Sequence, residues 1–312
     1  MKPYIAGMTW GWTGVRGTWN TPEADQSMEL MKEKLHVNWT AISFGALQDH
    51  PQATEIRYYD EPTVTDEEVR SAIAKAKELG LKVCLKPVVN CQDGTWRAHI
   101  NFFDYDVPCE PKWSQWFASY NRFILHYAKI AEETGCEMLC IGCEMVQTDR
   151  REQEWRNLIA EVRSVYSGII TYNCDKYQED RVKWWDAVDV ISSSGYYPFD
   201  NWEEQLNRIE PVVKQFNKPF FFMEAGCPSR DGSQYIPNDW GLVGGPDEDA
   251  QVLFYDSMFG ACDKRGWVEG FMLWDWPAKL YNPEDAAKND DYCMYGKKAE
   301  SVVRAYYSTK TK

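Results

Sequence analysis

The sequence predicts an α/β fold, a single (β/α)8 TIM barrel, with one domain over residues 1–312. Short apolar runs alternate with amphipathic helical segments, which is typical of a parallel sheet with crossover helices. Eight such runs occur, the number that this barrel requires. No low-complexity segment, linker or block of like charge divides the chain, and α/β barrels often occupy this length as one domain.

The eight strand candidates follow one another at regular intervals. Each is a short apolar run bounded by polar or turn-forming residues. They are residues 4–10, 38–45, 81–89, 137–145, 168–173, 188–198, 218–226 and 268–276. No Gly-x-Gly-x-x-Gly or P-loop pattern follows any of them, which argues against nucleotide-binding folds.

Helical segments connect the strand candidates. Residues 65–80 begin with a capping box, in which Thr65 is the N-cap and Glu68 the third helical residue. Residues 110–135 are long and amphipathic, and residues 152–168 carry apolar side chains at helical spacing. These segments predict the outer layer of the barrel.

Composition limits the kinds of ligand. The chain is 44% hydrophobic, which is ample for a core, and it holds 15 Trp and 18 Tyr, whose rings can fill the interior or stack on apolar ring faces. The net charge of −14 argues against nucleic acid or an anionic membrane as a partner, because both require a basic surface. A neutral or cationic ligand is easier to accommodate.

Targeting and metal-binding signals are weak. Residues 1–14 lack the apolar stretch of a signal peptide, so we expect a cytoplasmic protein unless a leader has been trimmed. The ten cysteines are spread along the chain and many lie in apolar runs, which predicts reduced, buried thiols. Cys140 and Cys143 form a pair without a second pair at zinc-finger spacing, so we expect no metal and no cofactor.

The carboxyl ends of the strands are polar and aromatic, whereas the strand bodies are apolar. In this fold the chemistry lies at those ends. The strand-end residues are Trp10, Lys86, Asn90, Glu144, Asn173, Tyr196, Tyr197, Glu224, Trp274 and Trp276.

Two of these residues form a pair with a chemical meaning. Glu144 and Glu224 each finish an apolar run, on the fourth and seventh strands, which face each other across the barrel. Two carboxyl groups on opposite sides of a sugar-sized cleft can hydrolyse a glycoside: one donates a proton to the leaving oxygen, and the other attacks C1 or activates water. The alternative is that each Glu is a buried ion-pair partner of a cation such as Lys86.

The motifs around this pair resemble a known family. They are "IGCEM" with the segment that follows it, "WWDAVDVISSSGYYP", "KPFFFMEAGCPSR" and "GFMLWDWP". Over most of residues 137–276, and more weakly from Ile5, the chain resembles the glycoside hydrolase family 113 β-mannanases, within the clan of (β/α)8 retaining glycoside hydrolases. The resemblance implies that Glu144 is the acid/base and Glu224 the nucleophile. It also implies that Tyr196 hydrogen-bonds the nucleophile and that Trp274 lies beneath the −1 sugar.

One position departs from the clan. Much of the clan has Asn before the acid/base, where it binds the 2-hydroxyl of the sugar, but this chain has Cys143. The axial 2-hydroxyl of mannose is compatible with a different contact there.

The remaining strand-end residues are candidates for substrate binding, and each has an alternative. Lys86 and Asn90 could bind hydroxyls or brace a loop. Trp10, with Trp12 beyond it, could stack on a sugar or close the barrel. Asn173 and Trp276 complete the predicted binding set.

The leading hypothesis is a retaining hydrolase of β-1,4-mannosidic linkages in oligosaccharides derived from mannan or glucomannan. A hydrolase of another β-linked glycoside, such as a β-glucoside, would use the same carboxyl groups. A carbohydrate-binding barrel without catalysis is a third hypothesis, and a scaffold without a ligand is a fourth. The long segments 90–113 and 228–250 would decide between endo and exo action.

Overall fold

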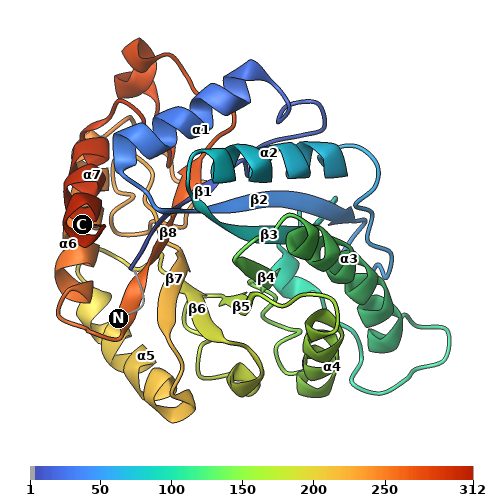
Figure 1. The fold of residues 1–312 in the computed structure, drawn as a ribbon. Coiled ribbons are helices and arrows are strands. Elements are labelled where there is room, and N and C mark those ends of the chain that lie inside the picture. The colour runs from blue at the N-terminus through green and yellow to red at the C-terminus, as the bar shows by residue number, and fades with distance from the viewer. Residues whose placement is uncertain (1–3, 312) are drawn as a thin grey trace.

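The eight predicted strands form a closed parallel barrel in sequence order, with helices around it (Figure 1). The computed structural model of the protein describes residues 4–311. The strands are β1 Ile5–Trp10, β2 Trp39–Gln48, β3 Lys82–Cys91, β4 Met138–Cys143, β5 Ile169–Cys174, β6 Val190–Ser194, β7 Phe220–Glu224 and β8 Val268–Trp276. The predicted fold class is therefore confirmed.

The strands that carry the two acids are buried throughout. Every residue of β4 and β7 is buried, as expected for parallel strands covered on both faces. The pairing of β2 with β3 extends through Gln48 and Cys91, further than the sequence predicts, because both strands continue in register. In contrast, β6 ends at Ser194, and residues 195–198, which the sequence assigns to the strand, form a loop at its carboxyl end.

The outer layer contains seven α-helices and three 3₁₀ helices within residues 4–311. They are α1 Pro22–Leu35, α2 Asp66–Glu78, η1 Arg97–His99, α3 Trp113–Glu133, α4 Glu152–Arg163, η2 Trp185–Ala187, α5 Trp202–Phe216, α6 Glu248–Cys262, η3 Pro283–Lys288 and α7 Lys298–Lys310. The predicted capping box is present: the Glu68 N–H donates to the Thr65 hydroxyl at 3.2 Å, and the Thr65 N–H donates to the Glu68 carboxylate at 2.9 Å.

The connection between β5 and β6 contains only the short helix η2. Two buried tryptophans fill the space there. The Trp184 indole N–H donates to the Asp149 carbonyl at 3.1 Å, and that of Trp185 donates to the Glu179 carbonyl at 2.8 Å. Packing of these rings takes the place of a longer helix in this layer.

The cysteines allow one further comparison with the sequence. All ten cysteines are free thiols, and all except Cys109 are buried, as predicted. None of the helices in residues 4–311 has the length and apolar character needed to cross a membrane.

Candidate active site

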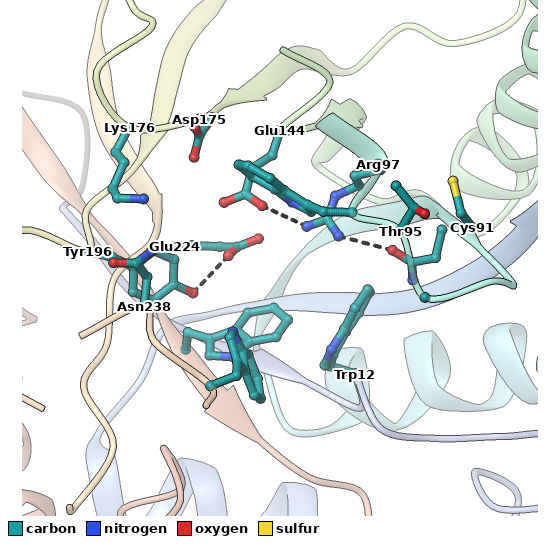
Figure 2. Close-up of a pocket in the computed structure, with 15 residues that line it drawn as sticks. Trp12, Cys91, Thr95, Arg97, Glu144, Asp175, Lys176, Tyr196, Glu224 and Asn238 are labelled. Carbon is teal, nitrogen blue, oxygen red and sulfur yellow. Dashed lines mark hydrogen bonds and ion pairs between the residues drawn. The ribbon is translucent and has the colours of Figure 1, made fainter. Parts of the chain in front are cut away.

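A cavity of about 590 Å³ opens at the carboxyl ends of the strands, and both predicted acids line it (Figure 2). Its wall comes from the ends of β3 to β8 and from the loops that follow β1, β3, β5 and β7. The lining residues are Trp12, Asn90, Cys91, Gly94, Thr95, Trp96, Arg97, Glu144, Asp175, Lys176, Tyr196, Glu224, Asn238, Trp240 and Trp274. The cavity therefore lies at the carboxyl ends of the barrel strands, where the chemistry of this fold is expected.

Glu224 ends β7 at the floor of the cavity, and only 4% of the residue is exposed. Its Oε1 forms an ion pair with the ammonium group of Lys86 and accepts a hydrogen bond from the Cys143 thiol at 3.2 Å. Its Oε2 accepts a hydrogen bond from the Tyr196 hydroxyl at 2.8 Å, the bond that the resemblance implied. The carboxylate is thus oriented by groups from three other strands or strand ends.

Electrostatics keep Glu224 ionised. Burial opposes the charge, but the cations of Lys86 and Arg97 outweigh it, so the pKa of this carboxyl lies below its ordinary value. Hydrogen bonds from Lys86 and Tyr196 act in the same direction. Lys86 itself is fully buried, and although burial disfavours its charge, the neighbouring Cys143 and Glu224 raise its pKa. A carboxylate that stays ionised is suited to act as a nucleophile.

Glu144 follows β4 and has different neighbours. Its backbone has φ of 51°, a left-handed conformation that few residues other than glycine adopt. Its N–H donates to the Asn173 carbonyl at 2.8 Å, which ties this turn to β5. One carboxylate oxygen accepts from the Ser194 hydroxyl at 2.7 Å, and the other forms an ion pair with Arg97 at 2.8 Å.

Arg97 is the main site residue that the sequence did not predict. It belongs to η1, in the long segment after β3, and its guanidinium also donates to the Cys143 carbonyl at 2.9 Å and to Asn90 Oδ1 at 3.0 Å. The guanidinium lies 5.9 Å from the ring centroid of Trp12. It therefore joins the acid to the cavity wall (Figure 2).

Asp175 is a third carboxyl group at the cavity. It directly follows β5, it is 7% exposed, and Figure 2 shows it on the same side as Glu144. Burial, and next the charge of Glu144, raise its pKa to about 8. A raised pKa keeps the proton on this carboxyl group to a higher pH than usual, and in the protonated form it can donate a hydrogen bond to a ligand.

The other predicted binding residues fall into three sets. Asn90, Tyr196 and Trp274 line the cavity. Lys86 and Asn173 are fully buried below it, where Lys86 donates to Asn173 Oδ1 at 3.1 Å. Neither side chain lines the cavity: Lys86 supports Glu224, and Asn173 supports Lys86.

Trp10 and Trp276 lie outside the cavity, which corrects the prediction that they bind substrate. Both are buried in the hydrophobic core. The Trp10 indole N–H donates to the Ser27 hydroxyl of α1 at 3.4 Å, and that of Trp276 donates to the Ser27 carbonyl at 3.0 Å. They point toward the helical layer and close the barrel there.

Aromatic rings still dominate the cavity. Trp274 lines the cavity beside Lys86, and Trp12 packs edge-on against Trp274 at 5.3 Å between ring centroids. Trp96 and Trp240 expose 42% and 63% of their surfaces at its rim. Exposed indole faces beside carboxyl groups are suited to bind the apolar faces of sugar rings.

Comparisons with known proteins identify the family. The model of Glycoside Hydrolase Family 113 matches residues 8–297. The chain belongs to this family. The resemblance seen in the sequence motifs is thereby confirmed, and the protein is a glycoside hydrolase. No curated protein matches the chain.

Solved structures agree with this family. A family 113 β-1,4-mannanase solved as a complex is 54% identical, with 98% of this chain and 99% of that chain covered and a TM-score of 0.97. The family 113 β-mannanase of Alicyclobacillus acidocaldarius, solved in complex with ManMIm, is 46% identical, with 98% of each chain covered and a TM-score of 0.95. A β-glucuronidase of Bifidobacterium dentium, 16% identical with a TM-score of 0.65, shares the fold; this chain covers 46% of it.

Proposed function

We propose that the protein hydrolyses β-1,4-mannosidic linkages in mannan-derived or glucomannan-derived oligosaccharides by a retaining, double-displacement mechanism. One observation carries the proposal: two buried carboxyl groups with different partners, Glu144 and Glu224, line one cavity together with Trp274. The substrate class rests on the similarity to a protein described as a β-1,4-mannanase at 54% identity and to one described as a β-mannanase at 46% identity.

The first step forms a covalent intermediate. A sugar ring stacks on Trp274, and Glu224 attacks its C1 from below while the hydrogen bond from Tyr196 and the ion pair with Lys86 hold the carboxylate in place. Glu144, carrying a proton, donates it to the glycosidic oxygen as the C1–O bond breaks. The leaving sugar departs with that proton, and a glycosyl ester on Glu224 remains.

The second step restores the enzyme. Glu144, now ionised, removes a proton from a water molecule, which attacks C1 and displaces the Glu224 carboxylate. Two inversions give net retention. Arg97 forms an ion pair with Glu144, so it stabilises the charge that this acid carries between the two steps.

The test combines stereochemistry with azide rescue. NMR during hydrolysis of a mannohexaose should show the β-anomer as the first product. We expect Glu144→Gln and Glu224→Gln each to lower kcat by several orders of magnitude, because an amide can neither transfer the proton nor attack C1. With azide and an activated aryl β-mannoside, Glu224→Gln should yield the α-mannosyl azide, whereas Glu144→Gln should yield the β-mannosyl azide.

A matched control separates chemistry from folding. Glu137→Gln makes the same substitution at the opposite end of β4, where Glu137 pairs with Lys77, so it should retain wild-type kcat. An α-anomer as first product would show inversion and make Glu224 a general base. Hydrolysis of β-glucosides in preference to β-mannosides would instead support the alternative substrate, and binding without any turnover would support a non-catalytic barrel.

A further inference from the structure

A buried pair of polar residues, Tyr172 and Asp149, lies beside the turn that carries Glu144. Tyr172 belongs to β5, and Asp149 lies in the segment between β4 and α4. Tyr172 has no exposed surface, and Asp149 is 4% exposed. Neither residue lines the cavity of the candidate active site, and no step of the proposed mechanism uses them.

The turn at Glu144 needs support because its backbone is left-handed, with φ of 51°. A residue other than glycine keeps such a strained conformation only where the surrounding structure holds it. The Glu144 N–H donates to the Asn173 carbonyl at 2.8 Å, and the Met145 N–H donates to the Tyr172 hydroxyl at 3.1 Å. The peptides before and after the Glu144 Cα are thus both fixed to β5, one through a main-chain carbonyl and the other through a side chain.

The Tyr172 hydroxyl is itself oriented by Asp149. Its oxygen accepts from Met145, and its proton is donated to the Asp149 carboxyl group. Burial raises the pKa of Asp149 to about 7, and the hydrogen bond from Tyr172 opposes this rise. A carboxyl group keeps an oxygen that can accept in either protonation state. Within residues 4–311 the second carboxyl oxygen of Asp149 has no hydrogen-bond partner, so the contact with Tyr172 is the one that satisfies this group.

Two tryptophan rings fix this pair. The Trp184 indole N–H donates to the Asp149 carbonyl at 3.1 Å, and that of Trp155 donates to the Thr148 carbonyl at 3.0 Å. The Tyr172 ring packs against both indoles, with ring centroids 4.9 Å from Trp184 and 5.2 Å from Trp155. Close packing leaves the ring little freedom to move, so its hydroxyl is a fixed point for the turn.

We propose that Tyr172 and Asp149 are positioning residues for the proton donor Glu144. The inference rests on the proposed function. Tyr172 holds the peptide that follows Glu144, and Asp149 directs the hydroxyl that does so. Proton transfer requires the carboxyl group within hydrogen-bond reach of the leaving oxygen, and a displacement of about 1 Å can lower a rate about a hundredfold. Loss of the pair should impair proton donation and leave Glu224, on the facing strand β7, in place.

The test compares two substrates that differ in their need for a proton. The leaving group of a dinitrophenyl β-mannoside departs without one, whereas that of a phenyl β-mannoside requires proton donation. The measured ratio is kcat/KM on the phenyl substrate divided by kcat/KM on the dinitrophenyl substrate. We expect Tyr172→Phe, which removes only the hydroxyl, and Asp149→Leu, which removes its acceptor, each to lower this ratio about tenfold. Glu144→Gln should lower it further.

Two variants are controls. Tyr166→Phe removes a buried hydroxyl that donates to the Cys136 carbonyl at 2.9 Å, near the opposite end of β4, so the ratio should stay within about twofold of wild type. Asp149→Asn keeps an oxygen that can accept from Tyr172, so it should preserve the ratio as well. Thermal unfolding shows which variants are folded. Tyr172→Phe and Asp149→Leu break the same contact from opposite sides, so either one suffices for the test.

The ratio decides the outcome. If a folded Tyr172→Phe or Asp149→Leu enzyme keeps it within about twofold of wild type, the inference is overturned and the proposed function stands. Equal losses of kcat/KM on both substrates overturn it too, because the pair would then support the barrel as a whole. A ratio in Asp149→Asn as low as in Asp149→Leu would contradict the hydrogen bond as the link. If Glu144→Gln leaves the ratio unchanged, Glu144 is not the proton donor, and the proposed function fails together with this inference.

Discussion

Lys86→Met should move the acid limb of the profile of kcat/KM against pH to higher pH. Lys86 is fully buried and its ammonium group forms an ion pair with Glu224, so the substitution removes a charge while it keeps a chain of similar length. Burial alone raises the pKa of a carboxyl group, and in the wild type the cations reverse this effect. Without Lys86, Glu224 should require a higher pH to ionise and attack C1.

The size of the shift follows from Coulomb's law. Two unit charges about 4 Å apart at an effective dielectric constant of about 20 interact by about 4 kcal/mol, so the loss of Lys86 should raise the pKa of Glu224 well above its wild-type value. Removing one partner of a buried pair also costs about 3–5 kcal/mol of stability. In the wild type, the lowered pKa of Glu224 stabilises the folded state at pH values above the ordinary pKa of a glutamate. This contribution is lost as the pH falls through the lowered pKa. In Lys86→Met the sign reverses, so stability should fall as the pH rises through the raised pKa.

The measurement is kcat/KM against pH on an activated aryl β-mannoside, because its acid limb reports ionisation of the nucleophile in the free enzyme. Thermal unfolding at matched pH values checks the stability change. Lys77→Met is the control, since Lys77 pairs with Glu137 at the opposite end of the barrel and its loss should leave the acid limb in place. An acid limb displaced by less than about 0.5 pH unit in Lys86→Met would refute the electrostatic account of Glu224.

Four other outcomes are expected. Arg97→Met should raise the acid limb less than Lys86→Met, because Arg97 is the weaker of the two cations that lower the pKa of Glu224. The wild-type profile of kcat/KM against pH should have an inflection near pH 8, because the pKa of Asp175 is about 8, and Asp175→Asn should abolish it. A crystal structure should place the carboxyl groups of Glu144 and Glu224 about 5–5.5 Å apart; a separation of about 6.5–9.5 Å would indicate inversion. Dialysis against EDTA should leave kcat unchanged.

The fold and the two acids could be predicted because both depend on local patterns. Each apolar run is a buried strand, and a single polar residue at the end of such a run lies at the carboxyl edge of the barrel. Glu144 and Glu224 satisfy this rule on facing strands. Asp175 satisfies it too, one residue beyond β5, and could have been found by extending the search by one position.

A position at the carboxyl end of a strand does not determine which way the side chain points. Trp10 and Trp276 are paired across β1 and β8, just after a register shift between Met8 and Trp10, and both turn toward Ser27 in α1. An irregularity of this kind changes the face on which the next residue lies, and it has no signal in the sequence. Arg97 was missed for a different reason: it lies in a long segment without periodicity, and only the fold brings it to Glu144.

The two cations of the site suit the different tasks of the two acids. Glu224 must stay ionised until it attacks, and its partner Lys86 is fixed in the middle of a strand with no exposed surface. Glu144 must carry a proton in one step and a charge in the next, and its partner Arg97 belongs to a 3₁₀ helix on the cavity wall, with 11% of its side chain exposed. A substrate can reach Arg97 directly but cannot reach Lys86. Binding can therefore alter the surroundings of the proton donor through Arg97, whereas the ion pair of the nucleophile with Lys86 stays out of reach of the substrate.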